Sequence, residues 1–181
     1  MSIPIYDEIA RKVKEGLLFE LTPTFGIQSR RIVASIEIND LLYGDWISQE
    51  WEDRRMGLRA DVDTFLEGKF VSVALPSGKP YARKAAADLR LLHPWGKEIW
   101  EIRSRHPDPE MSIRLFGRFA GQDCYVALAW EKRPRLGPPE SREWRDARVS
   151  CKTEWDKLFY PYPPLKGAIL HDYISTNCLL I

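Results

Sequence analysis

The chain has 181 residues, of which 44% are hydrophobic and 29% charged, and its formal net charge is +1. This apolar content excludes a disordered chain, and the length suits one domain with extensions. No apolar run approaches the roughly 18 residues that a membrane-spanning helix needs, so we expect a cytoplasmic protein without membrane association. The three cysteines lie too far apart for a zinc site or a disulfide framework.

The charge is distributed unevenly along the chain. Residues 1–70 carry nine basic and thirteen acidic side chains, whereas residues 71–181 carry eighteen and thirteen. The C-terminal part therefore permits a nucleic-acid surface, although a dedicated nucleic-acid binder is usually far more basic. The sequence contains no Ser/His/Asp nucleophile spacing, Gly-rich phosphate loop or His/Glu metal motif. We expect no metal and no cofactor.

The first half of the chain alternates helical and strand patterns. Apolar residues recur every four positions from Ile5 to Leu17, which is typical of an amphipathic helix. Alternating apolar and polar residues predict the strands, and composition predicts the later helices. The predicted elements, in chain order, are a helix over residues 4–19, a strand over 30–38, helices over 41–57 and 61–68, a strand over 70–75 and a helix over 81–92.

Three arginine-rich β-runs follow, over residues 98–105, 111–119 and 123–132. Each alternates apolar and polar side chains, and turn-forming residues separate the runs, so we predict an antiparallel three-stranded meander. The alternation assigns Trp100 and Ile102 to one face of the meander and the arginines to the other. The arginine face is either the ordinary solvated face of an antiparallel sheet or a concave cationic surface that binds phosphate.

The last third of the chain predicts a rigid loop, a long helix and an apolar tail. Prolines and a glycine predict the loop over residues 133–139, and a charged amphipathic pattern predicts the helix over 140–158. The tail, residues 166–181, must dock on something, for which the N-terminal helix is one candidate. We also consider that the tail covers the protein's own site. We divide the chain into an N-terminal extension (1–29), a central domain (30–160) and a C-terminal extension (161–181).

The predicted order of a strand, a helix pair, a three-stranded meander, a basic loop and a terminal helix resembles the RelE/ParE superfamily, particularly its HigB-like, phage-associated branch. The likeness centres on residues 91–159. Three segments carry it, namely Lys97-Glu98-Ile99-Trp100-Glu101-Ile102-Arg103, Ile113-Arg114-Leu115-Phe116 and Ala129-Trp130-Glu131-Lys132-Arg133. The resemblance implies an α+β domain in which an antiparallel sheet has helices packed on one side.

The resemblance also implies a function. Members of this family are toxins of toxin-antitoxin pairs that cleave messenger RNA, commonly on the ribosome, and need no metal. The RNA 2′-hydroxyl attacks the adjacent phosphate, while the protein supplies positioning, cationic stabilisation and proton transfer. The expected partners are therefore RNA and a cognate antitoxin.

Matching the family's basic strand positions and basic turn gives Arg103, Arg105, Arg114 and Lys132 or Arg133, and the family's C-terminal tyrosine or histidine has three candidates here, namely Tyr160, Tyr162 and His171. Gly117, which lies among them, indicates a β-bulge or a close approach to a ligand. The expected catalytic residues are Arg103, Arg114, Arg118, Lys132 and Tyr160, and the expected RNA-binding residues are Arg105, His106, Arg133 and Arg135.

A second interpretation stays open, in which the chain is a non-catalytic interaction protein of phage or mobile-element origin. The same sheet would then hold a protein partner. Arg103 and Arg105 can equally pair with Glu101 or Glu110 across strands, because opposite charges commonly pair there.

Overall fold

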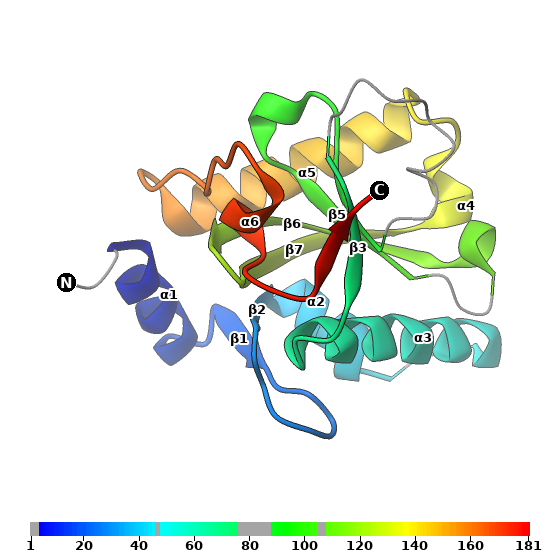
Figure 1. Cartoon of the computed structure of the whole chain (residues 1–181). Helices are drawn as coiled ribbons and strands as arrows, with labels where there is room; N and C mark the ends of the chain where they lie inside the picture. Colours follow the sequence, from blue (N-terminus) through cyan, green and yellow to red (C-terminus); the bar gives the residue numbers. More distant parts are fainter. Residues whose placement is uncertain (1–3, 46–47, 76–87, 105–107) are drawn as a thin grey trace.

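The computed structural model describes residues 4–45, 48–75, 88–104 and 108–181. It is an α+β fold built on one eight-stranded sheet (Figure 1). The elements, in chain order, are α1 (Pro4–Lys14), β1 (Leu18–Leu21), β2 (Arg31–Ser35), α2 (Ile36–Tyr43), α3 (Gln49–Leu66), β3 (Val71–Ala74), β4 (Leu89–Leu91), η2 (Trp95–Lys97), β5 (Trp100–Arg103), η3 (Pro109–Met111), β6 (Ile113–Gly121), β7 (Cys124–Lys132), α4 (Arg133–Leu136), α5 (Arg142–Phe159), α6 (Leu170–Tyr173) and β8 (Cys178–Leu180).

The sheet is mixed, with the strand order β1-β2-β7-β6-β5-β4-β3-β8. The meander β5–β6–β7 is antiparallel, as predicted. The prediction of a wholly antiparallel sheet is wrong, because β2 runs parallel to β7 and β3 runs parallel to both β4 and β8. Parallel strands need a crossover, and the helices α2 and α3 lie in the chain between β2 and β7. Alternation in the sequence predicted β2, β3 and the three meander strands, but not which distant strands pair with them.

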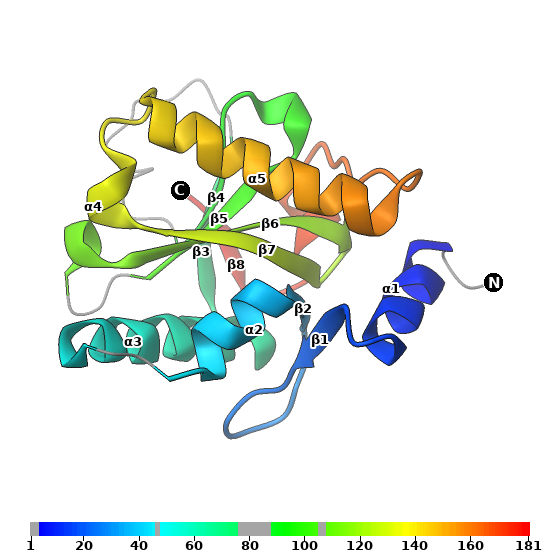
Figure 2. The same cartoon turned by 180° about the vertical axis from the view of Figure 1, so that it is seen from behind.

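Helices cover both faces of the sheet, so the expectation of helices on one side is wrong. One core lies between the sheet and α2, α3 and α6, and the other lies between the sheet and α1, α4 and α5. Figure 2 shows α5 running across the face of the sheet opposite to α6. The physical reason is visible in β6, whose nine residues are all buried. A strand buried on both faces requires cover on both sides.

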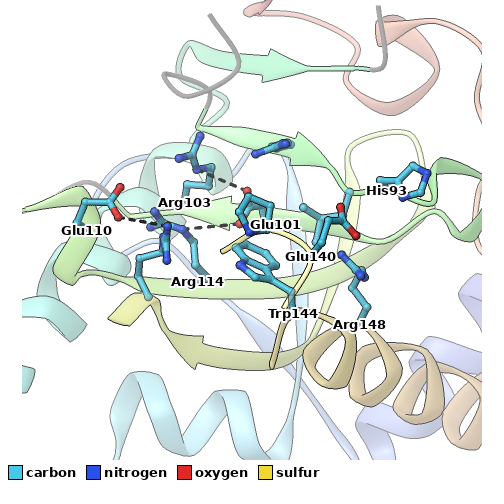
Figure 3. A pocket seen from close by; sticks show the side chains of 12 residues that line it. His93, Glu101, Arg103, Glu110, Arg114, Glu140, Trp144 and Arg148 are labelled. Carbon is cyan, nitrogen blue, oxygen red and sulfur yellow. Dashed lines mark ion pairs between the residues drawn. The ribbon is translucent and has the colours of Figure 1, made fainter. Parts of the chain in front are cut away.

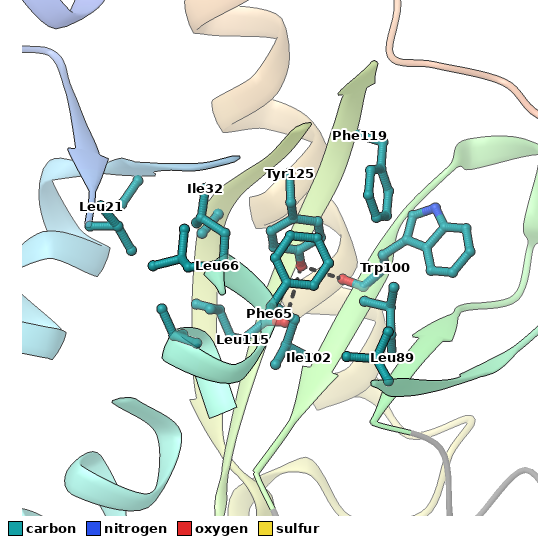
Figure 4. Close-up of a cluster of buried hydrophobic side chains, with 14 of the residues drawn as sticks. Leu21, Ile32, Phe65, Leu66, Leu89, Trp100, Ile102, Leu115, Phe119 and Tyr125 are labelled. Carbon is teal, nitrogen blue, oxygen red and sulfur yellow. Dashed lines mark hydrogen bonds between the residues drawn. The ribbon is translucent and has the colours of Figure 1, made fainter. Parts of the chain in front are cut away.

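Aromatic side chains fill the core on the α3 face (Figure 4). Phe119 packs edge-on against Trp100 and Tyr125, with ring centroids 5.2 and 5.4 Å apart. The Tyr125 hydroxyl donates to the carbonyl oxygens of Trp100 (3.1 Å) and Leu115 (3.3 Å), so its polar end is satisfied within the core. This core packs against the α3 face of the meander and fixes its position. It also confirms the predicted apolar face.

Gly117 lies at a register shift between β6 and β7, which confirms the predicted bulge. Phe116 pairs with Ala129 and Gly117 pairs with Ala127, so one residue of β7 has no partner across the ladder. A Cβ at position 117 would lie 2.2 Å from the Val126 carbonyl oxygen. Glycine is therefore required here by close packing of the two strands rather than by a ligand.

Several helices and strands end earlier than predicted, because a single residue terminates the element before its apolar pattern ends. Gly16, at φ +71°, follows the end of α1, and the residues predicted as its last turn form β1. Ser35 ends the strand β2 because its Oγ accepts from the Ile38 amide and caps α2. Residues predicted as two helices over 41–57 and 61–68 instead divide between α2 and the long α3.

The later elements follow the predictions more closely. The long terminal helix is confirmed as α5, and β3 matches the predicted strand over residues 70–75. The predicted loop contains one short helix, α4. The predicted helix over 81–92 is wrong at its end, because Leu89–Leu91 forms β4 between β3 and β5, and residues 81–87 lie outside the described ranges. Among the helices that the structure describes, none is both long and apolar enough to cross a membrane.

The C-terminal tail docks on the sheet, and not on α1 as one prediction had it. Strand β8 pairs with β3 at the sheet edge, and α6 contacts β6 on the α3 face. The buried Arg30 guanidinium holds the tail by donating to the carbonyl oxygens of Thr176 (2.6 Å) and Asn177 (3.3 Å). The segments predicted as extensions, 1–29 and 161–181, thus supply the two edge strands of the sheet.

Candidate functional site

A pocket of about 220 Å³ opens on the α5 face of the meander (Figure 3). Residues of β4, β5 and β6 form its base, while α4 and the first turns of α5 form its walls. Of the described residues, five arginines, three glutamates and one histidine line it. Cationic side chains are thus in excess, and they converge from elements that are far apart in the sequence.

Strand register brings the first of these side chains together. Arg103 on β5 lies directly opposite Arg114 on β6, and Arg90 on β4 lies opposite Glu101 on β5. Like charges directly opposite each other destabilise a sheet, so the arginine pair needs a counter-ion. Glu101 provides it, since its Oε1 lies 3.6 Å from the Arg103 Nε and its Oε2 lies 3.7 Å from the Arg114 Nε.

Arg114 and Glu101 form the floor of the pocket and are only 1% exposed each. The Arg114 Nη1 also donates to the Ser104 carbonyl oxygen at 3.0 Å and to the Ser112 hydroxyl. Burial lowers the pKa of Arg114 to about 10, while the Glu101 carboxylate opposes that shift. The guanidinium remains cationic at neutral pH, and its hydrogen bonds fix its orientation.

Arg133 and Glu110 form an ion pair at one rim of the pocket. Their nitrogen and oxygen atoms are 3.2 Å apart, and the Glu110 side chain is 72% exposed. The Arg133 Nη1 donates to the Gly137 carbonyl oxygen at 3.1 Å, which fastens the short helix α4 onto the following turn. An exposed ion pair contributes little stability and opens readily, so Glu110 can leave Arg133 when another anion arrives.

Three further charged side chains of the pocket are not paired in this way. Arg90 and Arg148 are half-buried, and Glu140 is exposed. Within the described part of the chain, none of the three side chains takes part in an ion pair or a hydrogen bond. Figure 3 shows His93, Glu140 and Arg148 at one end of the pocket, with Arg103, Glu110 and Arg114 at the other and Glu101 between them.

The wall that carries Glu140 and Arg148 is rigid. Ser141 begins α5 as its N-cap, with its Oγ accepting from the Trp144 amide. The buried Trp144 ring packs edge-on against Phe116, with centroids 5.8 Å apart, and its Nε1 donates to the Gly137 carbonyl oxygen at 3.3 Å. The start of α5 is thereby anchored to the meander and to the loop before it.

The structure brings only two of the five expected catalytic residues, Arg103 and Arg114, into the pocket. Arg118 is buried elsewhere, where it donates to the Lys97 carbonyl oxygen and stacks over Trp155 at 5.3 Å. This placement corrects the interpretation of the arginine face as an open concave surface. Helix α5 covers that face, and Arg118 lies beneath the helix.

Lys132 and Tyr160 also lie outside the pocket. The Lys132 Nζ lies 3.9 Å from the centroid of the Trp51 ring, which belongs to α3 and packs against the other core. Tyr160 is 86% exposed and follows the last residue of α5, whereas the pocket lies at the first turns of that helix. The two ends of an 18-residue helix are about 27 Å apart.

Of the expected RNA-binding residues, Arg133 lines the pocket. Arg135 does not, because it is exposed on the outer side of α4. Arg105 and His106 lie outside the described ranges.

Sequence reasoning missed three residues that line the pocket, namely Arg90, His93 and Arg148. Arg90 lies in the run Leu89-Arg90-Leu91, which alternates as a strand does but was assigned to a helix on composition. Arg148 lies within the predicted helix over 140–158 and His93 directly follows the predicted helix over 81–92, and neither pattern predicts a place in a site. The alternation around Arg90 was the one signal available in the sequence, because the rest depends on how α5 packs across the sheet.

No family model matches the chain, and comparison with curated proteins and with solved structures finds no match either. In the described ranges, His, Cys, Asp and Glu side chains form no group of three that could hold a metal ion. The function must therefore be inferred from the pocket and from the sequence motifs.

Proposed function

We propose that the pocket binds a phosphodiester of RNA and that the protein is a toxin-like endoribonuclease, which cleaves RNA by attack of the 2′-hydroxyl on the adjacent phosphate. The observation that carries the proposal is the pair Arg90 and Arg148. Both are half-buried in one pocket, and neither has a counter-ion among the described residues.

Physical chemistry favours an anion at this position. A partly buried cation loses hydration, and an anion that enters the pocket compensates for that loss. Guanidinium groups suit phosphate in particular, because their planar donors match two of its oxygens at once. The Arg103–Arg114 pair adds a fixed positive potential from the neighbouring strands, which Glu101 only partly neutralises.

The same arrangement suits the chemistry of RNA cleavage. When the 2′-hydroxyl attacks, negative charge builds up on the non-bridging oxygens of a phosphorane-like transition state. Preorganised cations stabilise that charge more than they stabilise the ground state, and a rigid pocket avoids the cost of reorienting them. The reaction yields a 2′,3′-cyclic phosphate and a 5′-hydroxyl.

The order of elements also supports the proposal. Strand β2, helices α2 and α3, the meander, the basic helix α4 and the helix α5 occur in the order on which the resemblance to the RelE/ParE superfamily rests, with β3, β4 and η2 inserted between α3 and the meander. We extend the proposal to a RelE/ParE-like domain with a cognate antitoxin as protein partner. The mixed sheet and the two helical layers would then be elaborations of that domain.

A binding experiment tests the proposal. A fluorescent single-stranded RNA is titrated with the native protein, with an Arg90→Met/Arg148→Met variant and with an Arg142→Met/Arg145→Met control, whose exposed arginines lie on the same helix outside the pocket. We expect the pocket variant to bind at least about 10-fold more weakly than the control, with a smaller salt dependence, because two phosphate contacts are lost. Equal affinity for both variants would contradict the proposal.

A second candidate function, protein binding without catalysis, is favoured by a different observation. Phe25 and Ile27 in the loop between β1 and β2 are 80% and 84% exposed. Exposed apolar side chains of this size commonly mark a protein contact. The test expresses each variant in cells and compares its effect on them with that of the native protein. If Phe25→Ser/Ile27→Ser abolishes this effect and Arg90→Met/Arg148→Met leaves it intact, protein binding is the function in place of RNA cleavage.

A further inference from the structure

We infer that Glu140 and His93 transfer the protons of the cleavage reaction, with Glu140 as the general base and His93 as the general acid. The inference rests on the proposed function and assigns roles that the basic residues of the pocket cannot fill, because a guanidinium remains protonated at neutral pH. Both side chains lie at the end of the pocket that holds Arg148 (Figure 3).

The surroundings of the three carboxylates select Glu140. Glu101 is 1% exposed and is held between Arg103 and Arg114, so an incoming hydroxyl cannot reach it. Glu110 is paired with Arg133 at the far rim. Glu140 is exposed, and no ion pair or hydrogen bond occupies it in the described part of the chain. It is therefore the carboxylate that a substrate hydroxyl can approach.

Among the residues that the structure describes, His93 is the one histidine that lines the pocket. It follows β4 directly after the strand ends, and its side chain is exposed at the rim. Imidazole is the side chain that most often donates a proton near neutral pH. The other charged groups of the pocket that face this pair are Arg90 on β4, Glu101 and Arg103 on β5, Glu110 on η3, Arg114 on β6, Arg133 on α4 and Arg148 on α5.

The two groups complete a balanced reaction. The 2′-hydroxyl gives its proton to the Glu140 carboxylate as its oxygen forms a bond to phosphorus. The bond between phosphorus and the 5′-oxygen breaks, and the protonated His93 ring gives its proton to that oxygen. Glu140 and His93 then return to their starting states by exchanging protons with water. No electrons are transferred to or from the protein, and no co-reactant is consumed.

The test compares Glu140→Gln and His93→Gln with two controls, Asp146→Asn and His171→Gln, which change exposed residues outside the pocket. Each protein is incubated with naked RNA and with messenger RNA on ribosomes, and cleavage is followed against pH. We expect kcat to fall about 100-fold or more in both pocket variants, with KM nearly unchanged, because general acid-base catalysis contributes on that order. The controls should retain native rates.

The pH profile separates proton transfer from a merely structural role. A base must be deprotonated and an acid protonated, so the native rate should fall at both low and high pH. Glu140→Gln should remove the dependence at low pH, and His93→Gln should remove it at high pH. Circular dichroism checks that each variant is folded.

Failure of the inference is distinguishable from failure of the proposed function. If the native protein produces 2′,3′-cyclic phosphate ends but both pocket variants keep the native rate and profile, the acid-base assignment is overturned and the ribonuclease proposal stands. If the native protein neither binds nor cleaves RNA in either form, the proposed function itself is overturned.

Discussion

The two ends of the pocket hold the same kind of side chain in different electrostatic surroundings. At one end Arg103 and Arg114 share the buried Glu101, and their guanidinium groups are part of the sheet's own structure. Arg148, at the other end, and Arg90, which lies opposite Glu101 on the neighbouring strand, form no ion pair with the residues that the structure describes. The difference teaches that an arginine-rich strand is not by itself a binding surface. The arginines left without internal partners mark the position where we propose that an anion binds.

The largest loss of stability is expected from removing the charge of Glu101, the counter-ion that Arg103 and Arg114 share. Glu101→Gln leaves two arginines facing each other across β5 and β6, one of them fully buried. We expect a loss of roughly 3 kcal/mol in the free energy of unfolding, because breaking a buried pair leaves an uncompensated charge. Urea denaturation measures it. Glu140→Gln serves as the matched control and should change stability by less than about 0.5 kcal/mol.

A second effect concerns Arg118, which was expected to be catalytic but lies beneath α5. Arg118→Met removes its hydrogen bond to Lys97 and its stacking on Trp155. We expect the free energy of unfolding to fall by about 1–2 kcal/mol. The RNA affinity of the folded variant should equal that of the native protein. A selective loss of RNA binding without a loss of stability would instead return Arg118 to the site.

A third effect should appear as weaker RNA binding without a change in the free energy of unfolding. Arg148→Met changes a half-buried side chain that makes no ion pair or hydrogen bond with the described residues. We expect unfolding free energy to stay within about 0.5 kcal/mol of the native value, while RNA affinity falls about 5- to 10-fold. Denaturation and anisotropy titration on the same sample measure both quantities. A large stability loss would show that Arg148 belongs with the structural arginines.

The smallest effect concerns Glu98, a buried carboxylate that forms no ion pair with the arginines that the structure describes. The Tyr173 hydroxyl donates to its Oε2 at 2.7 Å, yet burial raises the pKa of Glu98 above its ordinary value of 4.5. Because the folded-state pKa is the higher one, the protonated form favours folding, and stability is lost as pH rises from 4.5 through the raised pKa. Glu98→Gln should therefore raise Tm modestly at pH 7 and not at pH 4. A lowered Tm at pH 7 would contradict this sign.

Strand alternation predicted the meander and its two faces, because that signal is local to each run. It did not predict that β2 lies parallel to β7 or that β3 pairs with β8, since those pairs join residues far apart in the chain. Of the residues that line the pocket, the resemblance to the RelE/ParE superfamily predicted Arg103, Arg114 and Arg133 as site residues. It missed Arg90 and Arg148, whose surroundings depend on how α5 crosses the sheet.

The most direct measurement of the central claim is a nuclear magnetic resonance titration with a short 2′-O-methyl RNA, which binds as RNA does but lacks the attacking hydroxyl. Side-chain Nε–Hε signals of the arginines report which guanidinium groups meet phosphate. The account predicts saturable shifts at Arg90 and Arg148, accompanied by shifts of the His93 ring, with the Arg118 signal unchanged. Shifts confined to the exposed Arg135 and Arg142, or no saturable shift at all, would contradict it.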